Sequence, residues 1–165
     1  LKYSRDVHVD LWDDGDIAWF GDASQGGAKP MHCNIGFIGG SPFSWKMSSA
    51  KWTTLSVCEG EWFAQSGGAV TIQALTSVIK FLNLNVQFPI ISFCDNEVAV
   101  KISSGDYTTK HMKHVLTRMS YLCEQIKAGQ LIIIHIDTDG NIADIGTKPL
   151  APSTFHRLRA LLVYA

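Results

Sequence analysis

The chain has 165 residues, of which 46% are hydrophobic and 18% are charged. This length suits a single domain, residues 1–165, and the apolar fraction excludes an intrinsically disordered chain. The net charge of −1 does not by itself indicate a nucleic-acid-binding protein, and no apolar run approaches the roughly 20 residues that span a bilayer.

Short β-like runs follow a polar N-terminal stretch, residues 1–16, which we expect to be an extension or a polyprotein linker. This stretch lacks an initiator Met and does not resemble a signal peptide, so we expect the chain to be excised from something longer. The predicted strands cover residues 17–22, 34–38 and about 41–56, the third with a bend. Glycine pairs between them favour turns that join antiparallel strands.

Helical periodicity begins at Glu59 and continues to about Leu82, with a weak point of about 2 kcal/mol at Gly67-Gly68. The later predicted elements are a strand at 89–94, a helix at 96–103, a helix at 108–128, a strand at 130–136, and helical segments from about Asn141 and after Pro152. Strands joined first by hairpins and then by helices predict an α/β fold, with a mixed sheet and helices on its faces.

Four carboxylates stand out by their positions in these elements. Asp22 and Asp95 each end an apolar strand, Glu61 lies in the first turn of the long helix, and Asp144 lies at the start of a late helix. Strand ends and nearby helix N-termini are where an α/β sheet gathers its site. Converging carboxylates repel one another unless a cation such as Mg²⁺ binds between them. Taken singly, each of these acids could equally be a helix cap or a turn residue.

Several segments resemble, in the same order, the ribonuclease H domain of copia-type (Pseudoviridae) retrotransposon polyproteins. They are Trp19-Phe20-Gly21-Asp22-Ala23-Ser24, Gly36 to Trp45, Leu55-Ser56-Val57-Cys58-Glu59-Gly60-Glu61-Trp62, Cys94-Asp95-Asn96, Thr109-Lys110-His111, Ala143-Asp144-Ile145-Gly146-Thr147-Lys148-Pro149-Leu150, and the closing Phe155, Leu158, Arg159 and Leu162. The matching positions run from about residue 17 to residue 162.

The resemblance implies a ribonuclease H-like fold, with a five-stranded mixed β-sheet flanked by α-helices. It also implies two-metal-ion hydrolysis of the RNA strand of an RNA–DNA hybrid during reverse transcription. The implied cofactor is a pair of Mg²⁺ ions, with Mn²⁺ as a possible substitute. The implied partners are the hybrid and the polymerase domain of the reverse transcriptase, in the cytoplasm or a virus-like particle, with no membrane and no secretion.

Carried over residue by residue, the resemblance makes Asp22, Glu61, Asp95 and Asp144 the catalytic, metal-binding carboxylates. Glu59 is the nearest rival to Glu61, and we expect it to cap the helix N-terminus instead. Relatives carry a mobile histidine shortly before the last aspartate, a region held here by Thr138 and Asp139. We expect His135, which falls within a predicted strand, to be an ordinary side chain of the sheet.

Substrate contacts are expected on two surfaces. Residues 1–99 hold six Lys or Arg and ten Asp or Glu, whereas residues 100–165 hold eight and five, which could place a basic surface against phosphates. A solvated helix face would explain the same residues. The expected phosphate contacts are Lys110, Lys113, His114 and Arg118, and the expected 2′-hydroxyl contacts are Ser24, Gln25 and Asn96. Trp45 and Trp62 are expected in the core, and the four scattered cysteines as free thiols.

Two alternatives remain open at this point. The first is an integrase-like nuclease that cuts DNA, which the fourth carboxylate and the Thr147-Lys148-Pro149-Leu150 segment disfavour. The second is a catalytically weak or inactive module that binds hybrids inside a reverse transcriptase. Hybrid binding without metal-dependent cleavage would favour this second reading.

Overall fold

The computed structural model describes residues 16–25, 30–50, 56–84, 86–103 and 116–163. A five-stranded mixed sheet in the order β3-β2-β1-β4-β5 forms its centre, which confirms the predicted fold class. The elements are β1 (Ile17–Ser24), β2 (Met31–Ile38), β3 (Ser41–Ser49), α1 (Val57–Phe81), β4 (Ile90–Cys94), α2 (Glu97–Ser103), α3 (Leu116–Lys127), β5 (Leu131–His135), the 3₁₀ helices η1 (Thr138–Gly140) and η2 (Ile142–Gly146), and α4 (Pro152–Val163).

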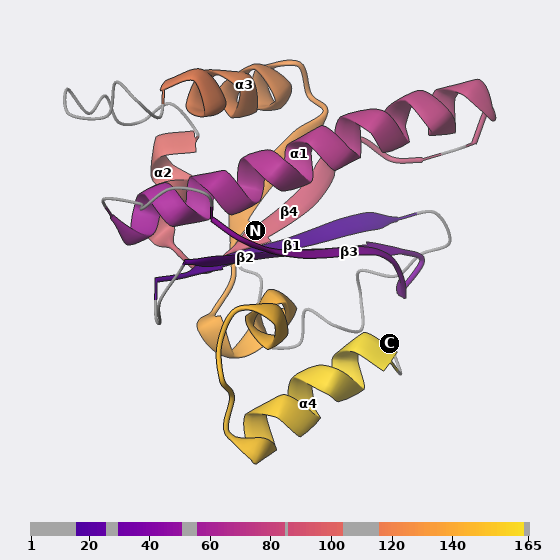
Figure 1. The fold of residues 1–165 in the computed structure, drawn as a ribbon. Coiled ribbons are helices and arrows are strands. Elements are labelled where there is room, and N and C mark those ends of the chain that lie inside the picture. The colour runs from indigo at the N-terminus through magenta and orange to yellow at the C-terminus, as the bar shows by residue number, and fades with distance from the viewer. Residues whose placement is uncertain (1–15, 26–29, 51–55, 85, 104–115, 164–165) are drawn as a thin grey trace.

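Strand β1 lies at the centre of the sheet, antiparallel to β2 and parallel to β4. The three helices α1, α2 and α3 lie on one side of the sheet, and η2 and α4 lie on the other (Figure 1). Two apolar clusters fill the two faces, one centred on Trp19 and Trp62 and the other on Phe20 and Phe37. All eight residues of β1 are buried as a result.

Helix α1 has a capped N-terminus and packs closely against the sheet at a glycine in its middle. Ser56 is the N-cap, and its hydroxyl accepts a hydrogen bond from the Glu59 N–H at 3.1 Å. Glu59 lies in the first turn of the helix, where we expected it, and the N-cap hydrogen bond itself comes from Ser56. A Cβ on Gly68 would lie 2.4 Å from Trp19 Nε1 and 2.9 Å from Asn34 Oδ1. Gly68, which looked like a weak point, lets α1 approach β1 and β2 closely.

Some other predictions need correction. The third strand ends at Ser49 rather than near residue 56, whereas the helical segment predicted from about Asn141 is present as the 3₁₀ helix η2. Trp62 is in the core as expected, but Trp45 is 68% exposed, because it lies on the edge strand β3.

The expected N-terminal extension lies outside the described residues, except for Asp16, and so does the first part of the helix predicted from residue 108. The four cysteines are free thiols, as predicted. Among the described helices, none combines the length and the apolar character needed to cross a membrane.

Candidate active site

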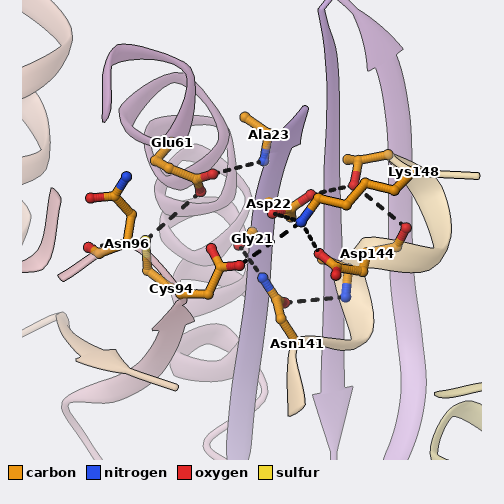
Figure 2. Close-up of polar contacts among 12 residues, drawn as sticks. Gly21, Asp22, Ala23, Glu61, Cys94, Asn96, Asn141, Asp144 and Lys148 are labelled. Carbon is orange, nitrogen blue, oxygen red and sulfur yellow. Dashed lines mark hydrogen bonds and ion pairs between the residues drawn. The ribbon is translucent and has the colours of Figure 1, made fainter. Parts of the chain in front are cut away.

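Four acidic side chains from four separate segments converge at one end of the central strands. Asp22 lies in β1, Glu61 in the first part of α1, Asp95 directly after β4, and Asp144 in η2. Strands β1 and β4 are parallel neighbours, so their carboxyl ends bring Asp22 and Asp95 to the same edge. Figure 2 shows Glu61 approaching the cluster from α1 and Asp144 approaching from the opposite side. The structure thus brings together all four carboxylates that the sequence singled out.

The carboxylate oxygens form two overlapping groups. Oxygens of Asp22, Asp95 and Asp144 lie within 4.8 Å of one another, and Glu61, Cys94 and Asp95 offer a second set at the same spacing. Asp95 belongs to both groups and therefore lies between them. Asp22, Glu61 and Asp144 are buried, with at most 4% of their surface exposed. Buried acids at this spacing require positive charge or protonation.

Lys148 supplies a positive charge within the first group. Its Nζ lies 2.7 Å from Asp144 Oδ1, 3.4 Å from Asp22 Oδ1 and 3.9 Å from Asp95 Oδ2. Burial opposes the charged form, but the hydrogen bond to Asp144 and the nearby carboxylates together raise the pKa of Lys148. An ammonium group therefore occupies the space between three carboxylates (Figure 2).

Polar groups around the cluster hold its members in place. The Asn141 side chain donates to the Gly21 carbonyl at 3.3 Å and accepts from the Ala143 N–H at 3.2 Å, which ties β1 to η2. The Thr147 hydroxyl donates a hydrogen bond to Asp22. The N–H of Ala23, next to Asp22, donates to Glu61 Oε1 at 3.3 Å. These bonds link β1 to α1 and to the residues that flank η2.

Burial and mutual repulsion change how the acids titrate. Burial, with the charges of Asp22 and Asp95, raises the pKa of Glu61 to about 9. Burial also raises the pKa of Asp144 to about 6, against the opposing effect of Lys148. The pKa of Asp95 is raised mainly by burial and by Asp22. Without a further cation, the site therefore keeps at least one proton at neutral pH.

The donor set fits hard divalent cations. Carboxylate oxygens are the ligands that Mg²⁺ and Mn²⁺ prefer, and Lys148 Nζ already marks a position where positive charge is stable. Cys94 does not change this chemistry, because burial and the Glu61 charge raise the pKa of its thiol and keep it protonated. The thiol lies 3.8 Å from Glu61 Oε2, as a weak donor. Asp22, Glu61, Asp95 and Asp144 could therefore hold metal, and that role stays a prediction.

An open cleft of about 820 Å³ lies beside the cluster and includes Glu61, Asp95 and Lys148 in its lining. The three residues predicted to contact 2′-hydroxyls also line this cleft: Ser24, Gln25 and Asn96. The position of their side chains fits a substrate contact, which stays a prediction. Arg118, one of the predicted phosphate contacts, is exposed on α3, and its guanidinium lies 4.8 Å from the centre of the Phe63 ring. Lys110, Lys113 and His114 lie outside the described residues.

His135 ends β5 close to the cluster. Its Nε2 lies 3.3 Å from the Asp95 carbonyl oxygen, and its ring is half-buried, so it contacts the site through the backbone. Thr138 follows in η1, and its side chain hydrogen-bonds to the Asp95 carboxylate. Thr138 thus contacts a site carboxylate from the segment that precedes Asp144.

Sequence reasoning missed a role for three residues that shape the site. Lys148 follows Asp144 by four residues, a spacing that brings side chains together in a helical segment. This spacing was the available signal, although Lys148 and Thr147 were noted only as part of a motif. Asn141 gave the signal of a helix N-cap, but its bond to β1 depends on the tertiary fold.

Comparisons with known proteins agree with this geometry. The chain is 25% identical over 155 residues to the "Retrovirus-related Pol polyprotein from transposon RE2" of Arabidopsis thaliana, covering 94% of the chain and 10% of that protein. It is 28% identical over 151 residues to the "Transposon Ty1-DR1 Gag-Pol polyprotein" of Saccharomyces cerevisiae, covering 88% of the chain and 8% of that protein. The chain thus spans about a tenth of the length of these relatives. No protein-family model matches it.

Solved structures of the same fold are ribonucleases H. RNase H1 from the archaeon Halobacterium salinarum superposes with a TM-score of 0.59 at 16% identity, covering 81% of this chain and 95% of that one. LC11-RNase H1, solved in complex with an RNA/DNA hybrid, gives a TM-score of 0.57 at 18% identity, covering 80% and 94%. The predicted ribonuclease H fold and the predicted likeness to copia/Ty1-type retrotransposon polyproteins are confirmed.

Proposed function

This chain has a ribonuclease H fold, and its relatives are retrotransposon Pol polyproteins; from this premise we propose that it hydrolyses the RNA strand of RNA–DNA hybrids. The observation that carries the proposal is the convergence of Asp22, Glu61, Asp95 and Asp144 beside an open cleft. Burying four acids together is unfavourable for stability, so their convergence indicates a functional site. In this proposal residues 1–165 form one domain of a longer polyprotein.

In this proposal the metal ligands follow the two overlapping sets of acidic residues. Asp22, Asp95 and Asp144 would hold one divalent ion, and Glu61 with Asp95 would hold the second. When bound, two such ions activate a water and stabilise the leaving oxygen of an in-line phosphodiester displacement. The hydrogen bonds from Ala23 and Thr147 orient the carboxylates of Glu61 and Asp22.

Several side chains of this protein would also contact the substrate. Ser24, Gln25 and Asn96 line the cleft next to the carboxylates and would contact 2′-hydroxyls, which distinguish RNA from DNA. Arg118 lies on α3, where it would contact a phosphate of the hybrid. LC11-RNase H1, which shares the fold, was solved with an RNA/DNA hybrid. In the parent element the domain would act beside the polymerase domain, in a cytoplasmic virus-like particle.

The test is cleavage of a strand-labelled RNA–DNA hybrid with Mg²⁺, with Mn²⁺ and with chelator. We expect metal-dependent cutting of the RNA strand that Asp95→Asn abolishes while the protein stays folded. Asp137→Asn is the matched control, because Asp137 is exposed and makes no capping hydrogen bond. Cutting of double-stranded DNA would favour an integrase-like nuclease. Binding of the hybrid without cutting would favour an inactive module, and either result would overturn the proposal.

A further inference from the structure

The proposed metal site already contains a cation from the chain itself. Lys148 Nζ lies within 4 Å of three of the four carboxylates, and its shortest contact, 2.7 Å, is to Asp144. A divalent ion held by these same carboxylates would need the space and the oxygen atoms that the ammonium group now uses. Two cations so close together would also repel each other strongly. Metal binding and the present position of Lys148 therefore exclude each other.

Hydrogen bonds around Lys148 hold the segment that carries it in place. The backbone N–H groups of Thr147 and Lys148 both donate to the Asp144 carbonyl oxygen, at 3.2 and 3.1 Å. The Thr147 hydroxyl, one residue earlier, binds Asp22. The turn that carries the lysine is thus anchored to the backbone of Asp144 and to the carboxylate of Asp22.

The surroundings stabilise the ammonium group between the carboxylates and also leave it room to move into the cleft. Asp22 and Asp144 are buried, so their charges have little access to solvent and need a counter-ion. The Lys148 side chain is 34% exposed and lines the open cleft. It can therefore turn into the cleft without any change in the core.

We propose that Lys148 is the built-in counter-ion of the site, holding Asp22, Asp95 and Asp144 together until a divalent ion displaces its ammonium group from them. This inference rests on the proposed metal-binding function. It makes Lys148 a positioning residue whose charge preforms the site in the metal-free protein. Metal binding is then an exchange of one cation for another, so the ammonium group lowers the affinity of the site for metal.

The test compares Lys148→Met with the wild type by calorimetric titration of Mn²⁺ and by thermal melting. Lys148→Met should bind Mn²⁺ about tenfold more tightly, because no cation competes for the carboxylates. It should melt at a lower temperature than the wild type in chelator, and the difference should shrink or reverse in saturating Mn²⁺. Lys148→Arg keeps the charge and should stay close to the wild type in chelator. Lys101→Met removes an exposed lysine paired with Glu97 and should change neither measurement.

Two results would overturn the inference: unchanged or weaker Mn²⁺ binding by a folded Lys148→Met, or an equal loss of melting temperature with and without metal. If Lys148→Met does not fold, NMR of the lysine-labelled wild type replaces it. The Lys148 side-chain signal, assigned by its loss in Lys148→Arg, should shift as Mg²⁺ is added. An unchanged signal at saturation would refute the displacement.

These measurements need no cleavage, so they separate the inference from the proposed function. If the wild type cuts no hybrid but Lys148→Met binds Mn²⁺ more tightly than the wild type, the result supports the counter-ion role alone. If the wild type cuts hybrids but the Lys148 variants bind metal as the wild type does, the result refutes the counter-ion role alone. Failure of both the wild type and Lys148→Met to bind Mn²⁺ would overturn the inference together with the two-metal mechanism.

Discussion

Replacing Glu61 by glutamine should make the metal-free protein less sensitive to rising pH. The pKa of Glu61 in the folded protein is about 9, against an ordinary value of 4.5. Between these values the folded protein holds a proton that the unfolded chain has released. The free energy of unfolding therefore falls as the pH rises through this window. Glutamine resembles the protonated acid in shape and has no proton to lose.

The size of the effect follows from the shift. One pH unit corresponds to about 1.36 kcal/mol for one proton, so raising the pH from 6.5 to 8.5 should cost the wild type about 2 to 3 kcal/mol through Glu61. Urea denaturation in chelator at several pH values, followed by circular dichroism, measures this for the wild type and Glu61→Gln. The difference between the two proteins should grow with pH by that amount, because contributions from other groups cancel.

Glu97→Gln is the control, because Glu97 is exposed and its hydrogen bond and ion pair with Lys101 lower the pKa of its carboxyl group. Glu97 is ionised between pH 6.5 and 8.5 in both the folded and the unfolded chain, so this variant should keep the pH dependence of the wild type. Parallel pH profiles for the wild type and Glu61→Gln would refute the reasoning, since they would mean that Glu61 releases its proton at an ordinary pH in the folded protein.

Three further predictions concern helix packing, substrate binding and the link between β1 and η2. Gly68→Ala should lower the free energy of unfolding by about 1 to 3 kcal/mol, because its Cβ would lie 2.4 Å from Trp19 Nε1. Gly67→Ala, whose Cβ meets nothing closer than 3.5 Å, should be neutral or raise it by up to about 1 kcal/mol in the same urea titration. Arg118→Ala should weaken hybrid binding a few-fold and reduce the slope of log Kd against log salt by about one, measured by fluorescence anisotropy; an unchanged slope would exclude a phosphate contact. Asn141→Ala should lower the free energy of unfolding by about 1 to 3 kcal/mol, because its amide bonds are buried; wild-type stability in urea would contradict this.

The order of the elements and the positions of the four acids could be predicted because they depend on local patterns. An aspartate after an apolar run is such a pattern, although only Asp95 directly follows its strand, whereas Asp22 lies inside β1, which continues to Ser24. Parallel pairing of those strands then places the two side chains at one edge. Helix α3 was predicted to end at Gly129, and this glycine has a φ of +65°, which favours glycine.

The remaining features depend on contacts between distant segments, which periodicity does not encode. Trp45 looked like a core residue, but the sheet order puts its strand at an edge. Gly68 looked unfavourable in a helix until its contact with Trp19 was known. Lys148 had a recognisable motif around it, yet the structure was needed to show three acids around its ammonium group.

The wide separation of the site's residues along the chain also affects when the site can assemble during synthesis and folding. Asp22 and Lys148 contact each other although they lie 126 residues apart along the chain, so Asp22 is synthesised long before its partner. The central pairing of β1 with β4 joins segments on either side of the whole of α1, a long-range contact of the kind that slows folding. A nascent chain that ends before η2 would contain Asp22 and Asp95 without Asp144 and Lys148. The four-carboxylate cluster can therefore assemble only after η2 has been synthesised, and a chain truncated before η2 should lack it.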